Sequence, residues 1–522
     1  MFNLGIHGSH NATLALSYED TILEVVELER FISHKNAALY FYENPPHRIE
    51  FVREIDQYFK TKYNFTEYDV VMVNSMPEQE HLFPWKDVFG DSDIEHCDHH
   101  VAHASCAFYQ SPYNKALIVS FDGGSDEGFF NVYTIERGED PVKLYSGEKD
   151  YAVSYMATGH FVPAIRNEKD IYKGNLVYPG KLMGYVGYGE YRDEIANKLI
   201  KFYKSNTYDD IPDAVCRFVK IFGLIDWQEK FDDSYAKDVA TTNQIVFEKL
   251  FKEEVQPFLD QYPNLPLILT GGCALNIINN TNFAREREVF VPPNPSDCGI
   301  ALGALLSLIR PCYQVDVTYA GSPVWDRMEI GRHLRERESR ETCAKEIAEI
   351  IAGGGIVGVV RGGSEHGPRA LGNRSLLCDA TNPDMKDIMN LDVKNREPWR
   401  PFSPIVRLED LNKYFDWEKE SRHMTFSPEV RPEYRKLLSS ATHVDGTARV
   451  QTVTRDQNDY IYEILCELNT MTGNGVLLNT SFNVAGKPIL NTFREAFEVL
   501  DSKPINGLLL EDYYFPKNVT RK

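Results

Sequence analysis

The stretch FNLGIHGSHNATLAL, residues 2–16, places a small polar turn between two short apolar runs. A third apolar run follows at residues 22–26. Short apolar runs separated by Gly, Ser and Asn are typical of strands joined by tight turns. We therefore predict a β-meander with strands over 2–6, 12–16 and 22–26.

The same unit recurs about a hundred residues further along the chain. An apolar run at 116–121 leads into the turn Asp122-Gly123-Gly124-Ser125-Asp126, and a second run follows at 128–133. One such unit is more often an ordinary hairpin. Its repetition favours an α/β fold of the actin/sugar-kinase superfamily, in which two related lobes clamp phosphates.

The central part of the chain predicts helices over 195–203 and 244–251, where apolar residues recur at helical spacing. A buried strand is predicted at 265–270, and it ends in GGCALN, residues 271–276. A glycine turn that opens into a helix lets the backbone approach a phosphate. We therefore take Gly271, Gly272 and Asn276 as nucleotide-binding candidates.

The amino-acid composition changes between about 310 and 345, and a new strand is predicted within 353–360. This change places a boundary near residue 340 and predicts two domains, 1–340 and 341–522.

The chain has 522 residues, 43% of them hydrophobic and 25% charged, which are values of a globular protein. A net charge of −21 excludes a protein that coats nucleic acid by charge. We expect no leader and no membrane span, because no basic segment followed by an apolar one opens the chain. Nine cysteines without a CxxC pair favour a reduced, cytoplasmic protein.

A metal site is suggested by Cys97-Asp98-His99-His100-Val101-Ala102-His103. On a helix, residues four apart share one face, so His99 and His103 can bind one ion. Asp122 and Asp297 are the candidate carboxylates, and such a donor set suits Fe(II), Mn(II) or Zn(II). The alternative is a helix with two ordinary polar histidines.

His10 lies in the first polar turn. It is either a loop histidine bonded to backbone or a general base, since imidazole accepts a proton near neutral pH.

Several cations of the C-terminal part lie among Pro, Gly and aromatic residues, in GPRALGNRS (367–375), KNREPWRPF (394–402) and DGTARVQTV (445–453). Arg guanidinium groups match phosphate oxygens, and Lys adds a point charge. A pocket for phosphates is one interpretation, and ion pairing with the excess carboxylates is the other.

Taken together, these motifs resemble the NodU/CmcH-type O-carbamoyltransferases along nearly the whole chain. The matching stretches are GIHGSHNAT, ELERFISHK, DHHVAHASCAFYQSPY, SFDGGSDEG, YPGKLMGYVGYG, LTGGCALN, NPSDCGIALGA, EHGPRALGNRS, KNREPWRPFSPI, DGTARVQTV and LLNTSFNVAGKPI. The resemblance implies a duplicated actin/sugar-kinase-like (ribonuclease H-type) N-terminal domain and a YrdC-like α/β C-terminal domain.

The resemblance also implies an activity. Carbamoyl phosphate and ATP, with Mg²⁺, would give carbamoyl-adenylate and pyrophosphate in the C-terminal domain. The carbamoyl group would then pass to a hydroxyl of a small molecule, sugar or nucleoside-type acceptor in the N-terminal domain, and a homo-oligomer is compatible with this activity.

The same resemblance implies roles for single residues. His99, His103, Asp122 and Asp297 would hold a metal, Fe(II) with Zn or Mn as alternatives. His10 would deprotonate the acceptor, and Lys35 would contact the nucleotide phosphates. Carbamoyl phosphate and ATP would be bound by Arg369, Lys394, Arg400, Arg449, Asn479 and Ser481, with Arg374 and Arg396 as further candidates.

Two positions that bear on the site depart from the family pattern. Relatives usually carry Arg at the position of Gly363 and Asp at that of Asn11, so a phosphate contact and the charge beside His10 are in question.

A metal-dependent kinase or nucleotide phosphohydrolase on the same fold is the second hypothesis, and a binding protein with an inactive site is the third. Aromatic residues within 140–240 suit stacking on a sugar ring or ordinary packing: Tyr151, Tyr155, Phe161, Tyr172, Tyr178, Tyr188 and Tyr191.

Overall fold

The computed structural model describes residues 1–39, 45–74, 85–123, 128–166, 170–171, 175–205 and 210–517. Over these residues the chain is mixed α/β with three sheets, which confirms the predicted α/β class at this level. It divides into two compact units, one formed by Met1–Ser111 with Pro292–Lys522 and the other by Pro112–Val291. The predicted boundary near residue 340 stays a prediction.

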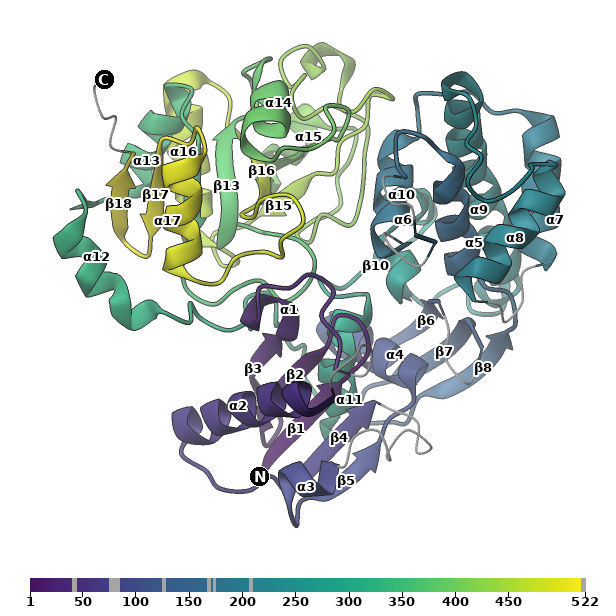
Figure 1. The fold of residues 1–522 in the computed structure, drawn as a ribbon, viewed down its shortest axis with the longest axis horizontal. Helices are drawn as coiled ribbons and strands as arrows, with labels where there is room; N and C mark the ends of the chain where they lie inside the picture. Colours follow the sequence, from purple (N-terminus) through teal and green to yellow (C-terminus); the bar gives the residue numbers. More distant parts are fainter. Residues whose placement is uncertain are drawn as a thin grey trace. The chain divides into compact units, whose positions relative to one another are not determined.

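The opening stretch of sequence lies in a five-stranded sheet of the first unit, in the order β3-β2-β1-β4-β5 (Figure 1). Strands β1, β2 and β3 are antiparallel, and β4 and β5 run parallel to β1. The predicted meander is therefore confirmed. The strands are β1 (Phe2–His7), β2 (Thr13–Tyr18), β3 (Thr21–Glu27), β4 (Val70–Asn74) and β5 (Asp93–His96).

Two helices of this unit determine the geometry of the site, α4 (His99–Gln110) and α11 (Ile300–Ile309). Helix α4 begins after Asp98, whose side chain accepts the N–H of Val101 at 2.8 Å. Helix α11 packs against both α4 and β1. A Cβ on Gly303 would lie 1.9 Å from the Ala102 oxygen, so only glycine permits this close approach. The remaining N-terminal helices are α1 (Leu28–Phe31), α2 (Pro45–Tyr63) and α3 (Trp85–Phe89).

The C-terminal part of the same unit contains an eight-stranded sheet, in the order β11-β18-β17-β12-β13-β16-β14-β15. Ile347 and Ile351 of one helix and Ile464 and Leu465 of another pack in one apolar core with Leu377 of the sheet. The strands are β11 (Arg340–Glu341), β12 (Val357–Val360), β13 (Arg374–Asp379), β14 (Ser403–Arg407), β15 (Gln451–Val453), β16 (Val476–Ser481), β17 (Gly507–Leu510) and β18 (Tyr513–Pro516). The helices are α12 (Ile330–Glu336), α13 (Ala344–Ala352), α14 (Met385–Asp387), α15 (Leu411–Tyr414), α16 (Asp459–Thr472) and α17 (Phe493–Ser502).

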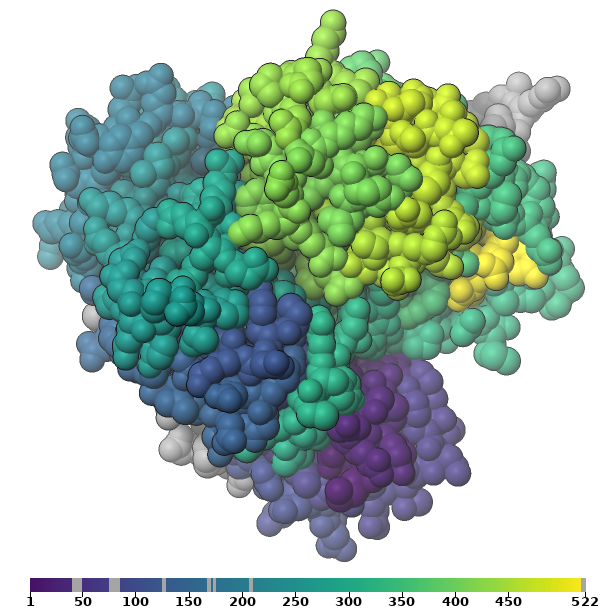
Figure 2. Space-filling model, turned by 180° about the vertical axis from the view of Figure 1, so that it is seen from behind, coloured from purple at the N-terminus to yellow at the C-terminus, as the bar shows by residue number. Residues whose placement is uncertain are grey.

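The segment between α11 and α12 joins the two sheets of this unit. The Val25 N–H donates to the Ala320 oxygen at 2.9 Å, and Val25 forms a β-bridge with Gly321. Figure 2 shows green surface from the middle of the chain directly beside the purple surface of the N-terminal strands, as the packing of α11 on β1 requires. The N-terminal strands and the C-terminal half are therefore held together within one unit.

The second unit contains a five-stranded sheet in the order β10-β9-β6-β7-β8. Strands β6, β7 and β8 are antiparallel, and β9 and β10 continue parallel to β6, which repeats the pattern of the first sheet. The predicted strands at 116–121 and 265–270 and the predicted helices are confirmed. The strands are β6 (Lys115–Phe121), β7 (Phe130–Glu136), β8 (Val142–Gly147), β9 (Leu267–Thr270) and β10 (Val289–Phe290). The helices are α5 (Tyr151–Thr158), α6 (Tyr178–Tyr185), α7 (Asp193–Ser205), α8 (Ile211–Phe222), α9 (Asp233–Gln261) and α10 (Ile277–Glu286).

The long helix α9 covers this second sheet. The Phe251 ring lies 4.5 Å from that of Phe121 and 5.5 Å from that of Phe130. Among the described helices, none combines the length and the apolar composition that crossing a membrane requires.

Candidate active site

A buried carboxylate, Asp297, lies at the centre of four histidines of the first unit. Its Oδ1 is 3.8 Å from Nε2 of His99 and 3.5 Å from Nε2 of His103, which lie one turn apart on α4. Its Oδ2 is 3.5 Å from Nε2 of His7 and 3.4 Å from Nε2 of His10. The structure therefore brings together three of the predicted metal ligands and the predicted base.

Burial alone would raise the pKa of Asp297, but His10, His103, His7 and His99 outweigh it and hold that pKa well below its usual range. The carboxylate is ionised and faces nitrogen atoms on both sides. A carboxylate oxygen and imidazole nitrogens that lie this close together can coordinate a divalent cation.

His7 is the member of this cluster that the sequence interpretation missed. Asn74 donates its amide N–H to the Cys97 oxygen at 3.0 Å, which directs its Oδ1 toward Nδ1 of His7 at 3.0 Å. His7 then donates from Nδ1 to Asn74, and its Nε2 is directed at the Asp297 carboxylate. A proton or a cation between Nε2 and the carboxylate oxygen stabilises this arrangement. The only sequence signal was the spacing of His7 and His10 around one turn.

The residues fit a metal ion by a second observation. The ligand atoms of His99, His103 and Asp297 all lie within 4.8 Å of one another, as shared coordination of one ion requires. His103 is 1% exposed at its side chain and Asp297 6%. Three donors from two elements are therefore in place in this unit.

His10 is more open than its neighbours, with 42% of its side chain exposed. Its Nδ1 lies 3.2 Å from Oδ1 of Asn11, which has a left-handed backbone with φ 60°. Asn11 can thus orient the ring although it carries no charge, and the negative charge beside His10 comes from Asp297. The departure from the family pattern at Asn11 is accommodated in this way.

Asp122 belongs to the second unit, where it follows β6. Its Oδ2 accepts the Gly272 N–H at 2.8 Å and its Oδ1 accepts the Gly123 N–H at 2.6 Å. Gly271 has φ 87°, and a Cβ there would lie 2.2 Å from the Phe121 oxygen. The Asp122 carboxylate is therefore hydrogen-bonded directly to the predicted phosphate-binding turn.

Asn276 makes side-chain hydrogen bonds within the second unit, and its contact with a nucleotide stays a prediction. Its amide forms a reciprocal pair with Gln244, at 2.9 and 3.0 Å, and its Oδ1 also accepts the Asn279 N–H at the start of α10. Tyr155 donates to Gln244 at 2.7 Å. Asn276 is 8% exposed, so in this structure its side chain shapes the turn.

The predicted phosphate-binding cations gather in the C-terminal part of the first unit. Burial and then Arg400 lower the pKa of Arg369 to about 10 and that of Arg396 to about 9. Burial and then neighbouring cations also hold the pKa of Lys394 and of Arg449 well below the usual range. We call Arg369, Lys394, Arg396, Arg400 and Arg449 the cationic cluster.

Lys35 lies near this cluster, although it is far away in sequence. It is exposed, and its charge contributes to the lowered pKa of Lys394. The predicted phosphate contact of Lys35 therefore concerns the same region as the cationic cluster.

Several members of the cluster are held by neutral groups. Lys394 follows a π-helical segment, Ile388–Val393, and donates to the backbone oxygens of Ser481 and Asn483 at 2.7 and 2.9 Å. Arg449 donates to Oγ of Ser403 at 2.9 Å. These contacts orient the cations without neutralising them.

Arg374, Asn479 and Ser481 support the fold around the cluster. Arg374 is fully buried and donates all its N–H groups to protein oxygens, those of Arg361, Gly362, Asn373 and Asn491. Asn479 donates to the oxygens of Ala370 and Gln451, and Ser481 donates to Asn483. In this structure these residues position loops, and a contact with ligand stays a prediction.

The aromatic residues expected to meet an acceptor are mostly packed. Tyr151, Tyr155, Phe161 and Tyr178 are buried in the second unit. Tyr188 is half-buried, Tyr191 is 45% exposed, and Tyr172 lies outside the described residues. Ordinary packing thus accounts for four of the seven.

The two clusters combine a site suited to a divalent cation with a site suited to a polyanion. Residues 10–306 match the family model described as "Carbamoyltransferase N-terminus", and residues 348–517 match "Carbamoyltransferase C-terminus". The chain therefore belongs to the carbamoyltransferase family, as its motifs indicated.

Characterised and uncharacterised proteins are similar to this chain. Protein sll1178 of Synechocystis sp., which is uncharacterised, is 30% identical, over 80% of this chain and 76% of its own. The nodulation protein NolNO of Sinorhizobium fredii is 31% identical, over 82% of this chain and 64% of its own. The 3'-hydroxymethylcephem-O-carbamoyltransferase of Streptomyces clavuligerus is 34% identical, over 64% of both chains.

Proposed function

We propose that this protein is an ATP-dependent O-carbamoyltransferase that activates carbamoyl phosphate as carbamoyl-adenylate. The observation that carries the proposal is the cationic cluster, five like charges crowded together in a chain of net charge −21. Crowded like charges are costly unless an anion neutralises them. Carbamoyl phosphate with ATP supplies several negative charges at one place.

The activation step sets the demands on this cluster. Forming carbamoyl-adenylate joins the carbamate oxygen to the α-phosphorus of ATP and expels pyrophosphate. Atom balance requires that carbamoyl phosphate also lose its phosphate to water. Fixed cations stabilise the charge that develops on the departing phosphates. Hydrogen bonds to neutral groups, such as that from Arg449 to Ser403, keep the cations in place.

The transfer step is assigned to the histidine–aspartate cluster. His10 accepts the proton of the acceptor hydroxyl as the carbamoyl carbon is attacked, and Asp297 stabilises the imidazolium that forms, at 3.4 Å. A metal held by His99, His103 and Asp297, with Asp122 as the predicted fourth ligand, would supply a Lewis acid. Fe(II) stays the expected metal, with Zn or Mn as alternatives.

The finer fold assignment belongs to the same proposal. We propose that the two five-stranded sheets are the duplicated halves of an actin/sugar-kinase-like domain and that the eight-stranded sheet belongs to a YrdC-like domain. The repeated strand order and direction of the two five-stranded sheets support the first assignment.

The proposed acceptor is a hydroxyl of a small molecule, sugar or nucleoside-type compound. The cephem O-carbamoyltransferase of Streptomyces clavuligerus, by its name, acts on a hydroxymethyl group. A screen scored by the mass of one added carbamoyl group would identify the acceptor of this chain.

Isotope exchange between ATP and pyrophosphate tests the activation step. We expect exchange that depends on carbamoyl phosphate and that falls about 100-fold or more in Arg449→Ala. Arg494→Ala, which changes an arginine with 78% of its side chain exposed, is the matched control and should leave exchange intact. His10→Ala should keep exchange and lose carbamoyl transfer.

Two outcomes would count against the proposal. If the protein with metal restored forms ADP and phosphate without exchange, a kinase or phosphohydrolase is the better assignment. If His10→Ala abolishes exchange, the base has been misassigned.

A further inference from the structure

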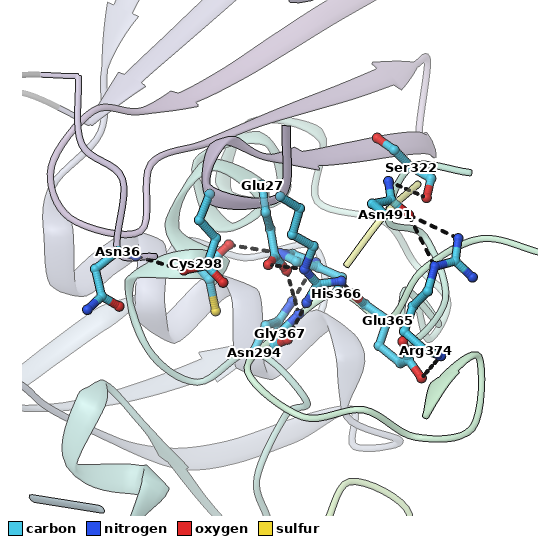
Figure 3. Close-up of polar contacts among 12 residues, drawn as sticks. Glu27, Asn36, Asn294, Cys298, Ser322, Glu365, His366, Gly367, Arg374 and Asn491 are labelled. Carbon is cyan, nitrogen blue, oxygen red and sulfur yellow. Dashed lines mark hydrogen bonds and ion pairs between the residues drawn. The ribbon is translucent and has the colours of Figure 1, made fainter. Parts of the chain in front are cut away.

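A short segment of the C-terminal part, Glu365–Gly367, lies against the loop that carries Asp297 (Figure 3). Nε2 of His366 lies 2.8 Å from the Cys298 oxygen, and Nδ1 lies 2.8 Å from Nδ2 of Asn294. The imidazole is 1% exposed. His366 therefore touches the chain on both sides of Asp297.

The same contact reaches helix α4. Gln110, the last residue of α4, donates to Oδ1 of Asn294 at 2.8 Å. Asn294 thus bridges His366 to the helix that carries His99 and His103. One buried histidine is linked to both elements that supply the candidate metal ligands.

The hydrogen bonds specify the protonation of His366. Gln110 directs the Oδ1 of Asn294 toward itself, so the amide N–H of Asn294 donates to Nδ1 of His366, and the ring proton lies on Nε2. Burial, and then the nearby Arg30, lower the pKa of His366 to about 4, against the opposing effect of the Cys298 contact. The ring stays neutral at physiological pH and keeps both bonds.

Two residues from the N-terminal part hold the peptide groups around His366. Arg30 donates to the backbone oxygens of Glu365 and Gly367. Glu27 accepts the Gly367 N–H at 2.7 Å and pairs with Arg30 at 2.9 Å. All these side chains are buried, so the segment has little freedom to move independently.

Glu365 extends the connection to the cationic cluster. Its Oε1 accepts the backbone N–H groups of Leu371, Asn373 and Arg374 at 2.7, 2.8 and 3.1 Å. These bonds close the loop of residues 366–374, which carries Arg369. Hydrogen bonds thus connect the residues on either side of Asp297 to the ends of the loop that carries Arg369.

We propose that His366 and Glu365 are positioning residues that couple the two clusters, so that a divalent cation at the histidine–aspartate cluster strengthens anion binding at the cationic cluster. The proposal rests on the proposed function in taking both clusters as ligand sites. A cation would fix the Asp297 carboxylate, and because His366 and Glu365 are buried and hydrogen-bonded on both sides, the constraint passes to the loop that carries Arg369. Coupling of binding free energies is reciprocal, so the anion must strengthen cation binding by the same factor.

Calorimetric titration of the full chain with sulfate, with and without Mn²⁺, tests the coupling. In the wild type we expect Mn²⁺ to tighten sulfate binding by about 5-fold or more, and sulfate to tighten Mn²⁺ binding equally. In His366→Gln each probe should still bind alone, while the factor falls to near one. His333→Gln is the matched control, since His333 is a buried histidine of the same unit that packs on Phe497, and it should keep the full factor.

The outcomes separate this proposal from the proposed function. A factor of one in the wild type, or an unchanged factor in folded His366→Gln, overturns the coupling. If His366→Gln does not fold, Asn294→Ser removes the same contact, and its factor decides in the same way. Because sulfate and Mn²⁺ report binding alone, the coupling can hold even if exchange between ATP and pyrophosphate is absent, and the reverse.

Discussion

At the scale of single residues, Gly271 of the 112–291 unit leaves almost no room for a side chain. Its positive φ disfavours any side chain, and a Cβ would meet the backbone oxygen of Phe121 at 2.2 Å. Because that oxygen belongs to the strand end before Asp122, the clash cannot be relieved by a side-chain rotation.

Substitution of Gly271 by alanine should therefore be unusually costly. We expect Gly271→Ala to lower the free energy of unfolding by about 3 kcal/mol or more. Gly223→Ala is the control, because Gly223 has φ 74° with nothing within 4 Å of a Cβ, and it should cost about 1–2 kcal/mol. Urea denaturation measures both, and equal losses would contradict the steric argument.

Arg374 and Arg449 have the same side chain in opposite settings. Arg374 donates every N–H to protein oxygens, whereas Arg449 donates to the neutral Ser403 hydroxyl and lies among cations. Removing donors from satisfied buried oxygens costs folding free energy, and removing one cation from a crowded cluster costs ligand affinity.

We accordingly expect opposite phenotypes for two lysine variants. Arg374→Lys should lose about 3 kcal/mol or more of stability, measured by thermal or urea unfolding. Arg449→Lys should unfold nearly as the wild type does and bind sulfate at least several-fold more weakly in calorimetry. A stable Arg374→Lys with weakened sulfate binding would place Arg374 in the ligand site after all.

At the scale of elements, the parts that periodicity reports were predictable. The apolar runs of β1, β2 and β3 and the spacing of His99 and His103 on α4 depend on neighbours in sequence, and local patterns encode them. His7 was missed because its role depends on Asp297, which is nearly 300 residues away. The pairing of Asn276 with Gln244 was likewise not visible, because Gln244 lies on another helix, α9. Long-range pairing of polar side chains leaves no periodic signal.

The end of β3 and the start of α1 carry the buried pair Glu27 and Arg30. Burial raises the pKa of Glu27 to about 7, although Arg30 acts against the shift. Above the pH at which an unfolded glutamate ionises, the folded chain retains a proton that the unfolded chain has released. The contribution of Glu27 to stability is thus fully present below about pH 4.5 and is lost as the pH rises through about 7.

The variant Glu27→Gln isolates this effect, since Gln resembles the protonated acid at every pH. We expect the stability of Glu27→Gln, relative to the wild type, to increase between pH 4.5 and 8 by up to about 3 kcal/mol. Chemical denaturation across this range measures it. A difference between the two proteins that does not change with pH would show that Glu27 is ionised throughout.

At the scale of the whole molecule, the chain assembles one compact unit from both ends. Met1–Ser111 folds with Pro292–Lys522, and the intervening Pro112–Val291 forms a unit of its own. The predicted boundary near residue 340 rests on composition, which follows the order of the chain. Composition does not report which distant segments pack together. The net charge of −21 is an average of the same kind, since the cationic cluster lies within it.

This averaging leads to a prediction about the stability of the unit that contains the cluster. Without an anion, the cations repel one another and are partly desolvated, so the native state carries an electrostatic cost. An anion that binds only the folded state should offset that cost and stabilise the unit, by about 2.7 kcal/mol at a concentration 100 times its dissociation constant.

Pyrophosphate in the presence of a chelator should therefore raise the midpoint of thermal unfolding in the wild type. Arg400→Ala should change the starting midpoint only slightly, because the repulsion that it relieves is offset by the loss of the ion pair with Glu397 at 3.8 Å, and it should reduce the response to pyrophosphate. Arg494→Ala, far more exposed, should behave as the wild type in both respects. Equal responses of all three proteins would mean that pyrophosphate acts through the solvent, and the cluster would then not be the anion site.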